Sequence, residues 1–425
     1  MLAEVAVTAS SSGSLVYVWD LRSGAILASL KGNNSAPRTT TTLPSQCLYS
    51  DAFLAAQNDR ALVNVWSWAK SQILAKFPLP EKLSALCASH SGLYCVGGGE
   101  SGRLYVWEMA TGKLLRTFDA HYKAVPVVRF TDDDAAFVTG GEDSVANVWR
   151  IAGVVDPGTE SIVVTPHASL SGHALPITDI AIGFGLFGSA RIVTSSADCT
   201  CKIWEAASGD LLTTLLFPTA VTSVALDQTE TRLYTGAADG KIHCTNLYRG
   251  GGGGGARDPP YGLAQGVTAG DAADAAADAD EPGSTGGVFS GHTACVSSLA
   301  FSFDGSLLLS GSDDGNAIVW DTASKQAMRT FSMHKTPVTS VTVLLQPPHL
   351  GDVGAAGQLL ASAVRPWQKH VAGHDTEENG QREVSWLLPA VTGSLPHGYV
   401  PEPASSLDLI ASIERRVQEI QRLEA

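Results

Sequence analysis

A short apolar run that ends in tryptophan recurs along the chain, and this repeat restricts the folds that the chain can adopt. Six such runs end at Trp19, Trp66, Trp107, Trp149, Trp204 and Trp320. A seventh run, KIHCTNL, has Asn246 in the tryptophan position. Four of the six intervals between successive anchors are 41 to 47 residues long, close to the roughly 40 to 45 residues of a four-stranded propeller blade. The repeat therefore predicts seven blades.

Two intervals exceed one period, and both contain extra loop material. Residues 153–168 form a stretch rich in Pro, Gly and Thr, and residues 249–287 hold a glycine run followed by DAADAAADADEPG. The second stretch has too little apolar side chain to offset the entropy lost on ordering. We therefore expect a disordered Gly/Ala/Asp-rich loop at residues 249–287 and no domain boundary.

The order of strands and turns within each unit predicts an all-β fold, because short runs of Val, Ile, Leu and aromatic residues alternate with turn residues. The first anchor, Trp19, leaves too little sequence before it for a whole blade. After Trp320, the segment HKTPVTSVTVLL is an innermost strand without a blade of its own. We expect the two ends to pair and close a seven-bladed β-propeller over residues 1–365, which removes exposed sheet edges.

Two further segments follow the predicted propeller. We expect residues 366–404 to be an irregular linker and residues 405–425 to be an amphipathic α-helix with Ser405 or Ser406 as its N-cap. Candidate partner-binding residues with a/d spacing are Ile410, Ile413, Val417 and Ile420. This seam predicts a short coiled coil or a helix-in-groove contact, with a partner or with a second copy. A terminal helix folded back onto the propeller rim is the alternative.

The segment SGSDDGNAIVWD, residues 310–321, together with His292 contains the residue types of a Ser/His/Asp catalytic site. Equivalent residues recur in three units, with Ser or Thr ten positions and Asp six positions before the tryptophan. The three sets are His121, Thr139, Asp143 and Trp149; His173, Thr194, Asp198 and Trp204; and His292, Ser310, Asp314 and Trp320. An active site needs such a set once, and no G-x-S-x-G motif is present. The recurrence therefore favours a structural role.

This recurrence resembles WD40 repeats, in which such residues form a hydrogen-bonded network that ties adjacent strands together. The resemblance implies the same role here, because a buried imidazole and a buried carboxylate must satisfy each other. The other units lack part of the set: Gly13, Arg60 and Ser101 stand in the Asp position. In the Asn246 unit, Asp239 is displaced by one position, so we expect that blade to be held mainly by apolar packing.

The composition argues against several classes of function. The formal net charge is -14, so we expect no direct nucleic-acid binding and no attraction to anionic lipid. The seven cysteines include no C-x-x-C pair and predict neither disulfides nor a zinc site. No P-loop or H-E-x-x-H motif stands out, so we expect no enzyme activity, no cofactor and no metal. Without a signal peptide or a long apolar segment, we expect a soluble intracellular protein and no membrane contact.

Longer stretches resemble one particular family of WD40 proteins. These stretches are SLVYVWDLRSGAILASLKGN at 14–33, HYKAVPVVRFTDDDAAFVTGGEDS at 121–144, GHALPITDIAIGFG at 172–185, RIVTSSADCTCKIWEAASGDLL at 191–212 and VFSGHTACVSSLAFSFDGSLLLSGSDD at 288–314. From about residue 3 to residue 345 the chain resembles the WD-repeat subunits of the Rix-type 60S pre-ribosome assembly complex. Members of that family also carry a helix after the propeller, as predicted for residues 405–425.

The resemblance implies a non-catalytic scaffold in the nucleoplasm and nucleolus that binds a large α-helical Rix-type subunit and further subunits of the complex. It implies contact with late pre-60S particles and their AAA ATPase, a role in processing the rRNA spacer, and a secondary role in DNA replication pre-initiation. An alternative is a WD40 substrate receptor of a cullin-RING ubiquitin ligase, because Trp19-Asp20-Leu21-Arg22 fits the W-D-x-R docking pattern. An ordinary blade end with a surface arginine accounts for the same four residues.

Overall fold

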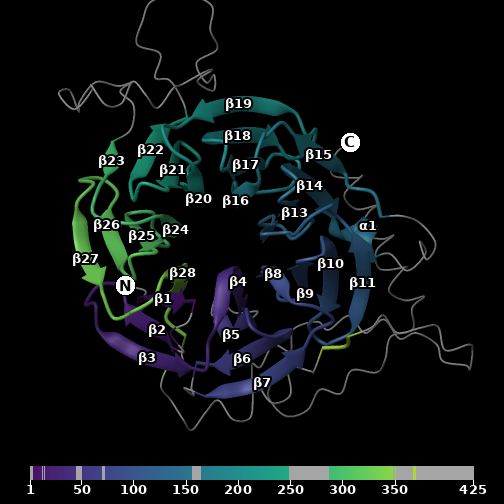
Figure 1. Cartoon of the computed structure of the whole chain (residues 1–425), viewed down its shortest axis with the longest axis horizontal. Helices are drawn as coiled ribbons and strands as arrows, with labels where there is room; N and C mark the ends of the chain where they lie inside the picture. Colours follow the sequence, from purple (N-terminus) through teal and green to yellow (C-terminus); the bar gives the residue numbers. More distant parts are fainter. Residues whose placement is uncertain are drawn as a thin grey trace, which may run out of the picture. The chain divides into compact units, whose positions relative to one another are not determined.

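Seven four-stranded antiparallel sheets are arranged in a ring in the computed structural model (Figure 1). The structure describes residues 3–11, 13, 15–44, 50–68, 72–155, 164–247, 287–347, 350 and 367–369. All of them belong to one compact unit, Met1–Gly373. Each sheet is one blade, which confirms the predicted all-β seven-bladed propeller. The predicted loop, apart from Gly287, and the predicted C-terminal helix lie outside the described residues.

Within each blade, the strands follow one another from the centre of the ring to its outside. Blade 1 contains β28 (Val338–Leu345), β1 (Glu4–Ser10), β2 (Leu15–Asp20) and β3 (Ile26–Lys31). Blade 2 contains β4 (Ser35–Pro44), β5 (Ser50–Gln57), β6 (Leu62–Ser67) and β7 (Ile73–Pro78). Blade 3 contains β8 (Leu83–Ala88), β9 (Tyr94–Gly99), β10 (Arg103–Glu108) and β11 (Leu114–Asp119).

The remaining blades follow in chain order. Blade 4 contains β12 (Val127–Phe130), β13 (Ala136–Gly140), β14 (Val145–Arg150) and β15 (Ala168–Ser171), with the short helix α1 (Ile151–Val155) before β15. Blade 5 contains β16 (Ile177–Ile182), β17 (Arg191–Ser196), β18 (Thr200–Glu205) and β19 (Leu211–Leu216). Blade 6 contains β20 (Val221–Leu226), β21 (Arg232–Ala237), β22 (Ile242–Asn246) and β23 (Val288–Phe289). Blade 7 contains β24 (Val296–Phe301), β25 (Leu307–Ser312), β26 (Ala317–Asp321) and β27 (Ala327–Phe331).

The two ends of the propeller sequence close the ring in blade 1. Strand β1 pairs with β2 on one side and with β28 on the other, in a register that runs from Glu4↔Leu345 to Ser10↔Val338. The predicted pairing of the chain ends is therefore confirmed. Because β28 covers the inner edge of β1, the backbone groups of that edge have partners within the ring.

A glycine in the second strand of four blades allows the next blade to pack closely. A Cβ atom on Gly98, Gly140, Gly236 or Gly311 would lie only 2.7 or 2.8 Å from a branched side chain at or next to the start of the next inner strand. Those side chains are Val125, Ile177, Val296 and Val338. A larger residue would push the blades apart, so these positions fix the spacing of neighbouring sheets.

The strand register corrects the alignment of blade 6. Leu233 pairs with Thr245, as Phe137 pairs with Trp149 in blade 4. Thr245 therefore occupies the tryptophan position, and the placement of Asn246 there is wrong by one residue. Counted from Thr245, Asp239 lies at its regular distance and is not displaced.

The inner strand of blade 2 carries a bulge that reaches across the ring. Between the pairs Ser35↔Gln57 and Thr40↔Ala55, β4 has three more residues than β5. Within this bulge, Arg38 has a φ of 59°, and its guanidinium donates to the Asp179 carboxylate and to the Thr222 carbonyl. These partners belong to β16 of blade 5 and β20 of blade 6, so one side chain connects three blades.

Trp367 and Gln368 pack against blades 2 and 3. The Trp367 ring stacks on Trp107 at a centroid distance of 4.6 Å and on Phe77 at 5.3 Å. Trp107 Nε1 donates to the Gln368 carbonyl at 3.1 Å, and the Gln368 amide donates to the Gly112 carbonyl. These two residues lie in the segment predicted as a linker, of which the structure describes only Trp367–Lys369.

Removal of β28 is expected to abolish cooperative unfolding. A chain that ends at Lys335 keeps every blade except the inner strand of blade 1, and it exposes the edge of β1. A control chain that ends at Pro347 keeps β28 and, like the shorter chain, lacks Trp367. It should unfold in one transition in urea, followed by tryptophan fluorescence. A single transition at the control's midpoint in the shorter chain would contradict the role of ring closure.

Candidate functional site

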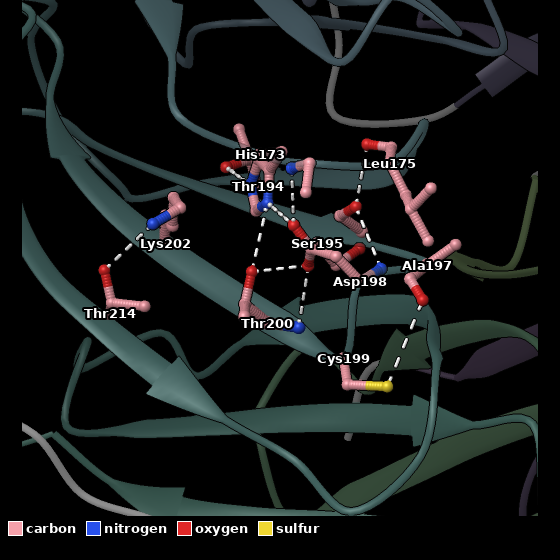
Figure 2. A network of polar contacts seen from close by, with 12 residues as sticks. His173, Leu175, Thr194, Ser195, Ala197, Asp198, Cys199, Thr200, Lys202 and Thr214 are labelled. Atoms are coloured by element: carbon pink, nitrogen blue, oxygen red, sulfur yellow. Dashed lines mark hydrogen bonds and ion pairs between the residues drawn. The ribbon is translucent and has the colours of Figure 1, made fainter.

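The structure brings the residues of each predicted set together at one end of the ring, which we call the network face. In blade 5, His173 Nε2 lies 2.8 Å from Thr194 Oγ1, and His173 Nδ1 lies 3.1 Å from Asp198 Oδ2 (Figure 2). Trp204 Nε1 donates to the same Thr194 oxygen at 2.9 Å. The set thus connects the segment before β16 with β17, β18 and the turn between them.

The other two sets repeat this geometry closely. In blade 4 the distances are 2.8 Å for His121 Nε2 to Thr139 Oγ1, 3.1 Å for His121 Nδ1 to Asp143 Oδ1, and 3.0 Å for Trp149 Nε1 to Thr139 Oγ1. In blade 7 they are 2.7 Å for His292 Nε2 to Ser310 Oγ, 3.0 Å for His292 Nδ1 to Asp314 Oδ2, and 2.8 Å for Trp320 Nε1 to Ser310 Oγ. One arrangement therefore serves three blades.

The hydrogen bonds assign one protonation state to each network histidine. An ionised carboxylate can only accept, so Nδ1 carries a proton and donates to the aspartate. In a neutral imidazole Nε2 then has no proton and accepts from the hydroxyl, whose oxygen accepts from the tryptophan indole. Burial lowers the pKa of His121, His173 and His292 despite the adjacent carboxylates. The neutral imidazole is therefore the form that fits the network at neutral pH.

Each network carboxylate also fixes the backbone of two loops. Asp314 accepts from the amides of Thr293 and Asn316. Burial alone would raise the pKa of Asp314, but these amides and His292 outweigh it and hold the pKa below the usual aspartate value. The carboxylate therefore stays ionised and holds the loop before β24 against the turn between β25 and β26.

The order of atoms in the network equals that of a Ser/His/Asp catalytic triad, with hydroxyl to Nε2 and Nδ1 to carboxylate. The network differs from a catalytic triad because a substrate cannot reach its hydroxyl groups. Thr139, Thr194 and Ser310 are 0% exposed, and each hydroxyl oxygen already accepts the indole proton. A substrate carbon cannot approach these oxygens, so the geometry favours strand tying over nucleophilic attack.

Blade 1 contains a partial fourth network that the sequence spacing missed. Trp19 Nε1 donates to Thr8 Oγ1 at 2.9 Å, and His334 Nε2 lies 2.8 Å from the same oxygen. The β1–β2 hairpin is one residue longer than its counterparts, so Thr8 lies eleven positions before the tryptophan. His334 comes from the opposite end of the chain. Treating the repeat as circular would have revealed this histidine.

The remaining blades lack the network for identifiable reasons. Trp66 Nε1 donates to the Lys31 carbonyl, and Trp107 uses Gln368, because Ala55 and Gly97 occupy the hydroxyl position in blades 2 and 3. In blade 6, Thr235 and Asp239 are present, but Phe217 and Thr245 replace the histidine and the tryptophan. Among the residues that the structure describes, the buried Thr235 hydroxyl has no hydrogen-bond partner.

Among the described residues, no group of three or more His, Cys, Asp or Glu side chains could hold a metal ion. In the same residues, no helix is long and apolar enough to span a membrane. The candidate partner-binding residues Ile410, Ile413, Val417 and Ile420 lie outside the described part of the chain.

Comparison with known proteins agrees with the blade pattern. The family model described as WD domain, G-beta repeat matches residues 112–150, 164–205, 209–246 and 283–321. WD repeat-containing protein 18 of Danio rerio is 34% identical over 351 residues, which cover 82% of this chain and 74% of that protein. The chain belongs to the WD repeat-containing protein 18 family. The matched repeats each begin near the outer strand of one blade and leave blades 1 and 2 and the inner strands of blade 3 unmatched, whereas the tryptophan repeat and the structure include them.

Two other proteins are also similar to this member of the WD repeat-containing protein 18 family. The protein named Pre-rRNA-processing protein IPI3 of Yarrowia lipolytica is 34% identical over 325 residues, which cover 76% of this chain and 71% of that protein. A crystal structure of the computationally designed Ika8 protein has a TM-score of 0.53 and 24% identity, and the match covers 80% of this chain and 93% of the designed one. The second likeness shows the fold alone.

Replacement of Asp314 by alanine is expected to lower the free energy of unfolding of this family member by about 1 to 3 kcal/mol, because His292 and two amides lose a buried acceptor. The neighbouring Asp313 is the matched control, since it is exposed. Asp313→Ala should change stability by less than about 0.5 kcal/mol. Equal urea midpoints for Asp314→Ala and the wild type would contradict the structural role.

The network also predicts a loss of stability in mild acid. Burial lowers the pKa of His334 to about 4, below the unfolded value near 6.5. The unfolded chain therefore binds more protons, and stability falls as the pH drops from about 7.5 to about 5, by about 2 kcal/mol for this group. His90, whose pKa is raised mainly by Asp134, acts in the opposite direction.

The measurement is urea unfolding of the wild type and of His334→Gln at about pH 7.5 and about pH 5. The variant should be less stable at neutral pH and should lose less stability on acidification than the wild type. The same pH dependence in both proteins would rule out titration of His334 as a cause.

Proposed function

We propose that this protein is a non-catalytic scaffold subunit that acts in pre-rRNA processing during assembly of the large ribosomal subunit. The observation that carries the proposal is the 34% identity to Pre-rRNA-processing protein IPI3 of Yarrowia lipolytica over 325 residues. A protein of the same name from Mycosarcoma maydis is 28% identical over 412 residues. The geometry supports a scaffold, because seven rigid blades offer broad faces while the hydroxyls of the triad-like sets are buried.

The proposed partners are proteins. The propeller would bind a large α-helical Rix-type subunit, and this complex would join the late nuclear pre-60S particle that a AAA ATPase remodels. The formal net charge of -14 supports contact with the particle through partner proteins, because carboxylates repel rRNA phosphates. We place this role in the nucleoplasm and nucleolus. A secondary role in DNA replication pre-initiation rests on the family resemblance alone.

We also keep the predicted domain organisation as part of the proposal. In it, the propeller extends over residues 1–365, a linker follows at 366–404, and a helix at 405–425 supports assembly or self-association. The a/d spacing of Ile410, Ile413, Val417 and Ile420 supports this role. The packing of Trp367 on blade 3 would hold the start of the linker at the rim.

The ubiquitin-ligase alternative has no specific support in the described residues. Asp20 accepts from the Ser23 hydroxyl and from the Arg22 amide, and Trp19 and Leu21 are buried. Asp321, Glu108 and Glu205 accept equivalent hydrogen bonds at the same place in other blades. The W-D-x-R residues thus form a turn that several blades share, and docking of a ligase adaptor through Arg22 stays a hypothesis.

Affinity purification of the tagged full chain from nuclear extract, followed by mass spectrometry, tests the proposed function. Rix-type subunits and large-subunit ribosomal proteins should co-purify, and depletion of the protein should cause spacer-containing pre-rRNA to accumulate. Arg22→Ala is the control and should leave these partners unchanged. Recovery of a cullin adaptor without pre-60S proteins, lost in Arg22→Ala, would overturn the proposal and favour the ligase alternative.

A further inference from the structure

A cavity of about 270 Å³ opens at the end of the ring opposite the network face. We call this end the turn face, because it carries the turns between the first and second strands of blades 3 to 7, residues 89–93, 131–135, 183–190, 227–231 and 302–306. The apolar part of the cavity lining comes from blades 4 to 7 and consists of Phe130, Ile180, Ala181, Ile182, Phe184, Val224 and Leu299. The cavity therefore lies at the centre of the ring and combines this apolar wall with the polar side chains of His90, Arg129 and Asp132.

Large apolar side chains are also exposed on the turns of this face. Phe184 lines the cavity and is 51% exposed, and Leu186 in the same turn is 70% exposed. Leu93 and Phe303, in the corresponding turns of blades 3 and 7, are exposed to a similar degree. Phe184 thus adds an exposed apolar side chain to a concave site, an arrangement typical of a binding surface, whereas single exposed apolar residues are common on any protein.

The five turns carry acidic residues and no lysine or arginine. The acidic residues are Asp132, Asp133, Asp134, Asp227, Glu230 and Asp304. The two basic side chains that line the cavity each lie beside a carboxylate: Arg129 Nη2 is 3.8 Å from Asp179 Oδ1, and His90 Nδ1 is 3.2 Å from Asp134 Oδ1. Arg191, directly after the third turn, lies 3.7 Å from Glu230, and the remaining carboxylates of these five turns favour cationic groups over phosphate-rich ligands.

Hydrogen bonds between neighbouring blades hold these turns in place. Asp134 accepts from the amides of His90 and Ser91 in blade 3, at 2.7 and 2.6 Å. Asp133 accepts from the Phe187 amide in blade 5 at 2.8 Å, and Glu4 accepts from the Phe303 amide in blade 7 at 2.9 Å. Because the turns are fixed before binding, a ligand would lose little free energy in ordering them.

From the cavity, its apolar rim and the charge of the turns, we propose that the turn face binds a basic segment of a partner protein through one apolar anchor residue. The anchor, such as leucine, enters the cavity beside Phe184, Val224 and Leu299. Flanking lysines or arginines lie over the carboxylates of the turns. An acidic peptide or an RNA would meet like charge there. The inference goes beyond the proposed function and holds for the isolated protein.

Fluorescence polarisation with the purified full chain tests this inference. The probes are a short fluorescein-labelled peptide with one leucine between flanking lysines, and the same peptide with serine in place of leucine. The leucine peptide should bind about tenfold more tightly, as expected for burial of one aliphatic side chain. The ratio of the two affinities distinguishes binding of leucine in the cavity from the general attraction of a basic peptide to an acidic protein, because both peptides carry the same charge. Equal affinities for the two peptides would overturn the inference.

Matched variants locate the binding site. Phe184→Ser should abolish the preference for leucine, whereas Leu175→Ser, an equally exposed position on the network face, should leave it unchanged. Asp132→Asn should weaken binding about twofold, and Glu142→Gln, the same charge change on the network face, should not. An unchanged preference in Phe184→Ser would overturn the inference. Tighter binding of a glutamate-flanked peptide or of a single-stranded RNA would also overturn it.

Discussion

The pairing of β28 with β1 is the contact on which the rest of the ring depends. It joins residues that are more than 300 positions apart in the chain, and it completes a sheet that otherwise lacks its inner strand. The same closure brings His334 to Thr8 and Thr40 to Ser340. Without it, blade 1 would expose two unpaired edges, and blades 7 and 2 would each lose a neighbour.

The buried polar networks add specificity to this apolar ring. Each joins a loop, two strands and a turn through one hydroxyl that both accepts and donates. This arrangement explains why the residues of a catalytic triad recur in a chain that uses them in its core: the donor and acceptor requirements of Ser, His and Asp are the same in both settings. Burial and the tryptophan indole distinguish the structural form from the catalytic form.

Much of this organisation could be predicted from the sequence. The tryptophan period predicted seven blades, and the fixed offsets found three networks, because hairpins of equal length give equal spacing. The fourth network escaped because its hairpin is longer by one residue and its histidine lies beyond the last anchor. The Arg38 bulge and the packing of Trp367 on Trp107 could not be predicted, because they join parts of the fold that only the closed ring brings together.

Native-state hydrogen exchange of the amides in β28 tests the central claim most directly. If the chain ends close one cooperative ring, the amides of Thr342 and Leu344, which face β1, should exchange with the free energy of global unfolding, as should those of β13 in blade 4. Urea should then reduce protection in both strands with the same slope. Exchange of the β28 amides through a separate opening of low free energy, while β13 stays protected, would contradict the account.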